Sequence, residues 1–416
     1  MWIPKNREEL KQHLSDPLFK NAYFLMLSSI TTAGSGFFFW LIAARFYRAE
    51  DVGLASAIIA AMGLIAMLSL LGFDVSLIRF LPERDDKAEL INSCFTVSLL
   101  TSFGLSLIFL SGVEIWSPPL VIIKENKILL LLFIIFTATL SLTGLQRGGV
   151  FVGLRRAEYT FMQNLVTFAR IGVVPFLTAF GALGIYVSFG LTPLLAFLLG
   201  IFLTSRVIPY RPFPEVKKEI IGSIFHFSSG NYAARIFEML PTFVLPIMVA
   251  NVLGVRANAY FYIAWQISML LLAIPRFTTM SLLAECSYSS DELRGNVKRA
   301  AKFIFLLLLA AITGVFLFGR YLLLIFGREY AENSFEVLLV LVLAAMPFAL
   351  NSLYVAVKRV RKEIRPVVWV YGGVAAFTIV GSYLLMQTMG LVGVGAAWLI
   401  GNGVVSLTVV KNLKST

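Results

Sequence analysis

Long, mostly apolar stretches recur along the whole chain and alternate with short segments that hold most of the charged residues. A helix needs about 20 apolar residues to cross a bilayer core about 30 Å thick. Stretches of this order cover residues 21–44, 52–73, 90–113, 128–146, 159–205, 220–251, 257–284, 303–319, 337–357 and 366–410. Two of them are long enough for two helices each, with turns expected at Gly181 and Gly184 and near 389–393. The pattern predicts an all-α integral membrane protein with twelve transmembrane helices.

The placement of lysine and arginine tests this topology, because these residues concentrate on the cytoplasmic side of membrane proteins. If the N-terminus is cytoplasmic and sides alternate at each helix, the inner segments hold 25 of the 35 basic residues and the outer segments hold 7. The other three are Arg170, Arg235 and Arg276, which lie inside predicted spans. We therefore expect a multi-pass protein of the cell (inner, cytoplasmic) membrane with both termini in the cytoplasm.

The composition excludes most soluble classes. Hydrophobic residues make up 58% of the 416 residues, charged residues only 14%, and the mean hydropathy is +0.84. Soluble domains carry about 45–50% apolar and about 25% charged residues. The net charge of +12 follows the inner loops rather than a nucleic-acid surface, and two cysteines and two histidines give neither a disulfide framework nor a metal cluster. No HExxH, Walker glycine loop or GxSxG motif occurs, and the charged residues 1–19 are not expected to form a cleavable signal peptide.

A proline-containing inner segment, 206–219, follows the sixth predicted helix and divides the chain into six plus six helices. This arrangement is typical of transporters built from parallel repeats. The predicted parts are a cytoplasmic segment (1–19), a first six-helix bundle (20–205), the cytoplasmic linker (206–219), a second bundle (220–411) and a cytoplasmic tail (412–416). We expect the two bundles to surround a central cavity.

Charged side chains inside the spans are costly, at about 2.5–3.5 kcal/mol each on insertion scales, and normally face a bundle interior or a wet cavity. Four spans carry polar residues at helical spacing along one face. These faces hold Asn231, Arg235, Glu238 and Thr242; Gln163, Thr167 and Arg170; Thr139, Thr143 and Gln146; and Ser28, Thr32 and Ser35. The stripes predict helices that line a common hydrated cavity with Arg170, Arg235 and Arg276 as its cations.

A packing interpretation stays open for part of this set. Arg235 and Glu238 are three residues apart and can neutralise each other, and serine and threonine stripes also let membrane helices pack closely. Asp74, near the inner end of the second span, is either a coupling carboxylate or an interfacial acid. Pro241 and Pro246 lie inside the seventh span and are hinge candidates, because proline kinks a helix.

The first eighty-five residues resemble a known family. The segments that carry the resemblance are Lys20-Asn21, Phe39-Trp40, Ala44-Arg45, Val52-Gly53-Leu54, Leu71-Gly72-Phe73 and Arg79-Phe80-Leu81-Pro82. They are similar to the polysaccharide biosynthesis (oligosaccharide flippase) family of the multidrug/oligosaccharidyl-lipid/polysaccharide (MOP) exporter superfamily. The resemblance implies alternating access through a cavity between two bundles, and transfer of a polyprenyl-pyrophosphate-linked sugar from the inner to the outer leaflet.

The charges suit that cargo. Three arginines and Glu238 give the predicted cavity a net charge of +2, against about −2 on a pyrophosphate diester, and guanidinium groups bind phosphate oxygens bidentately. The expected partners are the polyprenyl-pyrophosphate-linked oligosaccharide, membrane lipids and glycan-assembly enzymes, with no nucleic acid, no metal and no cofactor. We expect a monomer that is a transporter and not an enzyme.

The sequence leaves two alternatives open. A drug or metabolite:cation antiporter of the same superfamily needs a titrating carboxylate, and Glu238 or Asp74 offers one. A membrane glycosyltransferase or polymerase needs outer acidic residues, for which the pair Glu50-Asp51 is the candidate.

Overall fold

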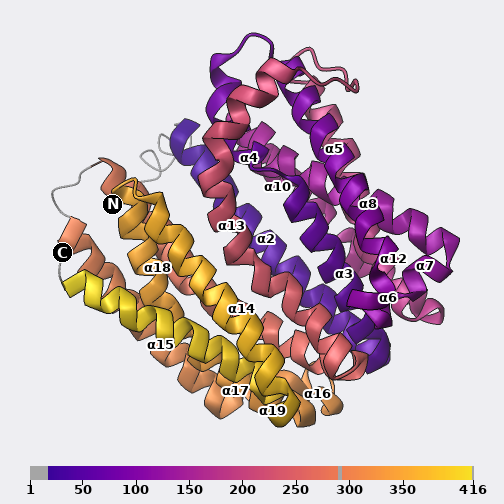
Figure 1. The fold of residues 1–416 in the computed structure, drawn as a ribbon, viewed down its shortest axis with the longest axis vertical. Helices are drawn as coiled ribbons and strands as arrows, with labels where there is room; N and C mark the ends of the chain where they lie inside the picture. Colours follow the sequence, from indigo (N-terminus) through magenta and orange to yellow (C-terminus); the bar gives the residue numbers. More distant parts are fainter. Residues whose placement is uncertain (1–16, 289–292, 415–416) are drawn as a thin grey trace, which may run out of the picture. The chain divides into compact units, whose positions relative to one another are not determined.

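The computed structural model describes residues 17–288 and 293–414, which form helices and no strand (Figure 1). The helices of the first part are α2 (Pro17–Phe46), α3 (Ala49–Ser69), α4 (Phe73–Phe80), α5 (Lys87–Ser111), α6 (Val113–Trp116), α7 (Ile122–Glu125), α8 (Lys127–Leu145), α9 (Phe151–Gly153), α10 (Ala157–Val166), α11 (Ala169–Val173) and α12 (Ala182–Ser205). Those of the second are α13 (Lys218–Val252), α14 (Val255–Tyr288), α15 (Leu293–Leu324), α16 (Arg328–Asn333), α17 (Phe335–Leu343), α18 (Ala345–Val360) and α19 (Ile364–Lys414). Short 3-10 turns η1 (Leu81–Glu83), η2 (Pro118–Leu120) and η4 (Val174–Phe180), and the π-helical turn η3 (Gln146–Val150), complete the described structure.

Among the described residues, eleven helical stretches are long and apolar enough to cross a membrane. Large apolar side chains on these stretches remain exposed; on α15, for example, Leu306 and Leu317 are each 65% exposed and Phe318 is 63% exposed. Soluble monomers rarely expose contiguous apolar surface of this kind, so these faces belong in lipid. The chain is an all-α, multi-pass membrane protein.

The longest stretch, Ile364–Lys411, covers 48 residues and folds back on itself. Gly390 breaks the helix with φ 57° and ψ −137°, a conformation that L-residues avoid. Glycines then bring the two arms together: a Cβ at Gly393 would lie 2.4 Å from the Leu385 carbonyl oxygen, and one at Gly401 would lie 2.8 Å from Thr378 Oγ1. Later residues of the second arm contact earlier residues of the first arm, which is the antiparallel order of a helical hairpin. The turn expected near 389–393 is therefore present.

The described helices fall into two compact units. Unit 1 comprises residues 1–39, 65–114 and 121–229, and unit 2 comprises residues 40–64, 115–120 and 230–416. The core of unit 1 includes the fully buried Phe73, Leu77, Leu145 and Phe151. The predicted boundaries at 206–219 stay a prediction.

Two local details recur in the two halves of the sequence. Gly181, between η4 and α12, has φ 53° and ψ −135°, almost the angles of Gly390 in the hairpin of α19. The side chain of Thr143 donates to the Pro193 carbonyl at 2.9 Å, and Asn351, 208 residues later, donates to the Asn402 carbonyl at 3.1 Å. These details recur at an offset of about 208 residues, as expected for two halves of six helices each.

Candidate functional site

A pocket of about 150 Å³ lies among α13, α14, α18 and α19, all within unit 2. Helical spacing builds it: Arg276, Thr279, Met280 and Leu283 share one face of α14, and Phe348, Ser352, Val355, Ala356 and Arg359 share one face of α18. Glu238 of α13 and Tyr371 of α19 complete the lining. The sequence brings three charged side chains into one small pocket.

Aromatic rings position both arginines of the pocket. The guanidinium carbon of Arg276 lies 5.5 Å from the centre of the Phe348 ring, and that of Arg359 lies 5.9 Å from the centre of the Tyr371 ring. Cations within about 6 Å of a ring face are attracted by its quadrupole. The rings therefore hold the guanidinium groups at the wall of the pocket, where their N–H groups can meet a ligand.

The pocket has a net charge of +1 from two arginines and Glu238. An excess of positive charge in a pocket of about 150 Å³ favours an anionic group over a cationic one.

The rest of the predicted stripe on α13 does not line this pocket. Arg235 and Asn231 are exposed, and Thr242 is half-buried. Pro241 and Pro246 lie inside α13, which continues through both as one helix from Lys218 to Val252. Their hinge role stays a prediction.

In unit 1, Arg170 lies on α11 and is only 6% exposed. Its guanidinium carbon is 5.0 Å from the ring centres of both Phe39 and Phe189, and Nη2 donates to Ser35 Oγ at 3.0 Å. Ser35 in turn donates to the Thr167 carbonyl at 3.1 Å. The structure brings together Arg170, Ser35 and Thr167, which belong to two of the predicted polar stripes.

The remaining polar stripes of unit 1 form hydrogen-bonded helix contacts. Gln163 Nε2 donates to Gln146 Oε1 and to the Ala196 carbonyl, both at 2.7 Å. Gly200 leaves room for this pair, because a Cβ there would lie 2.1 Å from Gln146 Oε1. The hydroxyls of this set donate to main-chain carbonyls: Thr143 to Thr139 and Pro193, Thr139 to Phe136, and Thr32 to Ser28.

These hydrogen bonds agree with the interpretation that the serine and threonine stripes serve helix packing. Gln146 and Gln163 are fully buried, and Ser28, Thr139 and Thr143 are each less than 9% exposed. Asp74 of α4 is also buried, at 5% exposure, and lies against Gly148. That these residues of the polar stripes and Asp74 line a cavity stays a prediction.

Sequence reasoning missed two arginines. Arg359 falls between the predicted spans 337–357 and 366–410, but it is in the last turn of α18 and lines the pocket. Arg147 comes directly after the predicted span 128–146, but it lies in the π-helical turn. There its Nη2 donates to the Gln163 carbonyl at 3.1 Å, and its carbonyl accepts from Thr160 Oγ1 at 3.2 Å. Among the described residues Arg147 forms no ion pair. The glycines 148 and 149 that follow it were the available signal of close packing.

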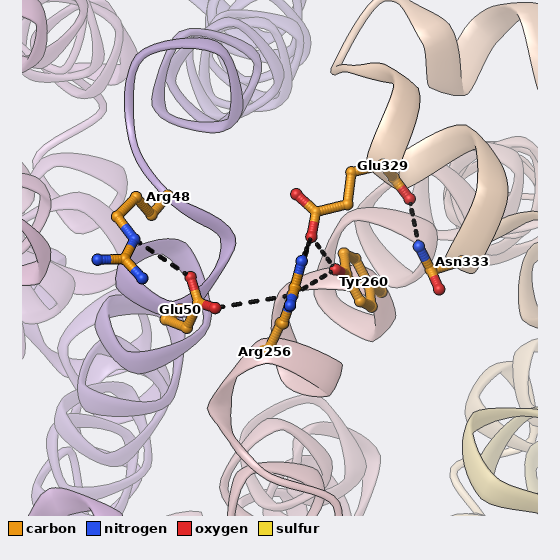
Figure 2. Close-up of polar contacts among 6 residues, drawn as sticks. All are labelled: Arg48, Glu50, Arg256, Tyr260, Glu329 and Asn333. Atoms are coloured by element: carbon orange, nitrogen blue, oxygen red, sulfur yellow. Dashed lines mark hydrogen bonds and ion pairs between the residues drawn. The ribbon is translucent and has the colours of Figure 1, made fainter.

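A second polar cluster joins the ends of α3, α14 and α16 within unit 2 (Figure 2). Glu50 lies 3.6 Å from Arg48 and 3.7 Å from Arg256, and Arg256 also pairs with Glu329. Tyr260 accepts from Arg256 Nε at 2.9 Å and donates to Glu329. The hydrogen bond from Tyr260 and the neighbouring Arg256 hold the pKa of Glu329 below its ordinary value.

Close backbone packing accompanies this cluster. A Cβ at Gly53 of α3 would lie 1.7 Å from the Val255 carbonyl oxygen at the start of α14. Asn258 donates to the Gly53 carbonyl at 2.7 Å and to Ser56 Oγ at 3.0 Å. The acidic pair Glu50-Asp51 was the candidate for an outer catalytic site. The two residues lie in the first turn of α3, and Glu50 belongs to an ion-pair network.

The sequence profile of the polysaccharide biosynthesis proteins matches residues 42–335. The chain belongs to this family. The family resemblance seen in residues 20–85 is thereby confirmed. Among curated proteins none matches the chain in sequence.

Solved structures agree on the fold of this family member. It is similar to the lipid II flippase MurJ in an inward closed conformation, with a TM-score of 0.79 and 13% identity over 94% of this chain and 87% of that one. An inward-facing multidrug resistance MATE family transporter of the MOP superfamily gives a TM-score of 0.72 and 17% identity over 93% and 96%. A MOP superfamily transporter from Pyrococcus furiosus, described as having a binding pocket of reverse polarity, gives 0.62 and 14% over 98% and 97%. The chain has the fold of MOP superfamily transporters.

Proposed function

We propose that this protein is a flippase that moves a polyprenyl-pyrophosphate-linked glycan from the inner to the outer leaflet of the cell membrane by alternating access. The observation that carries the proposal is the pocket of unit 2, which Arg276, Arg359 and Glu238 line. Membership in the polysaccharide biosynthesis proteins and the MOP transporter fold support it.

The chemistry of the pocket supports an anionic head group. Guanidinium groups present planar, permanently charged donors that match phosphate oxygens, and they do so most strongly where water is scarce. In this proposal the two arginines contact phosphate oxygens, and the glycan and the lipid tail extend outside the pocket. Glu238 keeps the empty pocket from holding two uncompensated cations.

The other predicted cations are further candidates for contact with the head group. Arg170 is a buried cation at membrane depth in unit 1, and Arg235 lies three residues before Glu238 on α13. A transporter that alternates between conformations needs contacts for its cargo at more than one stage. We propose these two arginines for stages at which the head group leaves the pocket.

The proposed topology has twelve crossings. A straight helix of 48 residues would be about 70 Å long, more than twice the bilayer core. The hairpin at Gly390 makes two crossings of this stretch, which raises eleven candidate spans to twelve and returns the C-terminus to the side of the N-terminus. The bias of basic residues supports the cytoplasm as that side.

The test is a flipping assay in liposomes that contain a fluorescent polyprenyl-pyrophosphate oligosaccharide. Arg276→Gln and Arg359→Gln each remove charge-assisted hydrogen bonds to phosphate, which are worth about 1.5–3 kcal/mol. We expect each variant to flip about tenfold or more slowly than the wild type. Arg361→Gln is the matched control, because Arg361 is an exposed arginine two residues from Arg359 that does not line the pocket.

Two results would overturn the proposal. In one, both pocket variants flip the lipid as fast as Arg361→Gln. In the other, the wild type leaves the lipid in place and exchanges small organic cations against protons or sodium, which is the behaviour of an antiporter that uses Glu238.

A further inference from the structure

Two turns between consecutive membrane spans hold a basic residue in an unfavourable backbone conformation. Arg155 has φ 55° and Lys362 has φ 60°. This left-handed region is uncommon for residues other than glycine, because the Cβ atom crowds the following carbonyl. Each turn therefore holds a long basic side chain at a position where glycine fits better.

The two turns are copies of one motif. The amide of Arg155 donates to the Val152 carbonyl at 3.0 Å and that of Arg156 to the Phe151 carbonyl at 2.7 Å. At an offset of 207 residues, the amide of Lys362 donates to the Arg359 carbonyl at 3.0 Å and that of Glu363 to the Lys358 carbonyl at 2.9 Å. This is the Schellman pattern of a helix end, and Arg155 and Lys362 occupy the position where glycine is the usual residue.

Both turns connect consecutive candidate spans, so in a bilayer we expect them near the lipid head groups. The candidate spans end at Gly153 and Val360 and resume at Ala157 and Ile364, which leaves three residues in each turn. The side chains of Arg155 and Lys362 are exposed, and within the described ranges neither forms an ion pair. A basic side chain at such a surface is attracted by anionic lipids.

The acidic residues near these turns already have partners. Glu158 forms ion pairs with Lys20 and Arg156, and Glu363 pairs with Lys358 at 2.7 Å. Residues 358–365 carry five basic residues and one acidic residue, a net charge of +4. Arg155 and Lys362 therefore present charge to the membrane surface and do not neutralise a neighbour.

We propose that Arg155 and Lys362 bind the phosphate groups of anionic phospholipids at the membrane surface. The strained conformation is retained in both halves because the basic side chain gains more from the lipid than glycine would gain from the relaxed backbone. The proposal goes beyond the flippase function, since these lipids are not the cargo. It assigns each unit one lipid site of the same geometry.

The experiment measures thermal unfolding midpoints of the full chain in nanodiscs of phosphatidylcholine alone and with phosphatidylglycerol added. In the neutral discs, Lys362→Gly and Arg155→Gly relieve strain, so we expect midpoints about 1–3 °C above the wild type. In the anionic discs we expect this advantage to vanish or reverse. The relative affinity for phosphatidylglycerol, measured by native mass spectrometry, should fall about fivefold for each lost charge.

Three further variants separate charge from backbone. Lys362→Arg keeps the charge, so phosphatidylglycerol should raise its unfolding midpoint as much as that of the wild type. Lys362→Gln should lose this increase, and its midpoint in neutral discs should not exceed that of the wild type, because glutamine does not relieve the backbone strain. Arg320→Gln removes an exposed arginine from a regular helical position near the end of α15, so it measures how much lipid response the loss of any one basic charge causes; the loss at Arg155 and Lys362 should exceed it.

Two outcomes would overturn the proposal. The first is a glycine variant that keeps the same advantage in both lipids, because the basic side chains would then gain nothing from anionic head groups. The second is an equal gain from soluble pyrophosphate in neutral discs, because the site would then bind free phosphate rather than a lipid.

Discussion

Arg256, in the first turn of α14, forms an ion pair with Glu329 of α16, and Tyr260 donates a hydrogen bond to the same carboxylate (Figure 2). The same guanidinium lies 3.7 Å from Glu50 at the start of α3. One arginine thus connects residues that are more than 200 positions apart in the sequence. Because these contacts join the ends of three helices, they stabilise the conformation in which those ends meet.

The lowered pKa of Glu329 predicts a pH dependence of stability. A carboxylate whose folded pKa is below its ordinary value of 4.5 stabilises the fold above that value, and this contribution is lost as the pH falls through the folded pKa. The side chain is 38% exposed, so the effect is small, about 1 °C in the unfolding midpoint. We expect Glu329→Gln to unfold earlier than the wild type at pH 7, and the difference to shrink progressively as the pH falls below 4.5.

The control is Arg328→Gln, which removes the neighbouring surface pair between Arg328 and Glu332. Differential scanning calorimetry of the detergent-solubilised proteins between pH 3.5 and 7.5 gives the unfolding midpoints to be compared. A Glu329→Gln difference that is constant across this range would contradict a role for the ionised carboxylate.

The contact between Gly53 and Val255 predicts a strong effect of a single methyl group. A Cβ at Gly53 would overlap the Val255 carbonyl oxygen at 1.7 Å, and a backbone atom cannot move aside cheaply. We expect Gly53→Ala to lower stability by about 1–3 kcal/mol, in the range of overpacked helix contacts. Gly104→Ala is the matched control, because a Cβ at this helical glycine of α5 would meet nothing within 4 Å and alanine is the better helix former. Equal midpoints for the two variants would show that α3 and α14 do not meet as described.

A substitution in the hydrogen-bonded pair Gln163–Gln146 tests whether these residues serve helix packing or line a cavity. Gln163→Leu leaves Gln146 Oε1 and the Ala196 carbonyl without their donor in a fully buried position, which costs about 1–3 kcal/mol. We expect a lower unfolding midpoint, with flipping per folded molecule retained. Gln387→Leu, at an exposed position of α19, is the control and should keep the wild-type midpoint. Normal stability of Gln163→Leu with loss of flipping would favour the cavity interpretation.

The membrane spans follow from the sequence because length and hydropathy alone decide whether a helix can cross a bilayer. The turn at Gly181 and the fold-back near 389–393 were predictable for a similar reason, since glycine marks the places where a helix reverses. The same pattern gave Arg276 and Glu238 as charged residues at membrane depth, and both line the pocket.

The pocket itself depends on information that a single helix does not contain. Arg359 reaches it only because the face of α18 that carries Phe348 packs near Tyr371 of α19. Helical spacing predicts which residues share a face, but it does not predict which face of a neighbouring helix they meet. For that reason Gln163 and Gln146, expected to line water, pair with each other inside unit 1.

The charge of the proposed cargo predicts that flipping responds to the membrane potential. Moving two negative charges out of a cell whose interior is negative gains about 4.6 kcal/mol per 100 mV. An arginine that moves with the head group would cancel part of this gain, so the size of the response reports how many cations accompany the cargo. We expect liposomes with an imposed potassium diffusion potential, negative inside, to flip the fluorescent lipid outward faster than liposomes without one. Addition of a protonophore together with an ionophore should remove the difference, and a lipid carrier with a neutral head group should show none. A rate that is the same at all potentials would mean that the protein neutralises the pyrophosphate completely during transfer, and the pocket arginines would then have to travel with it.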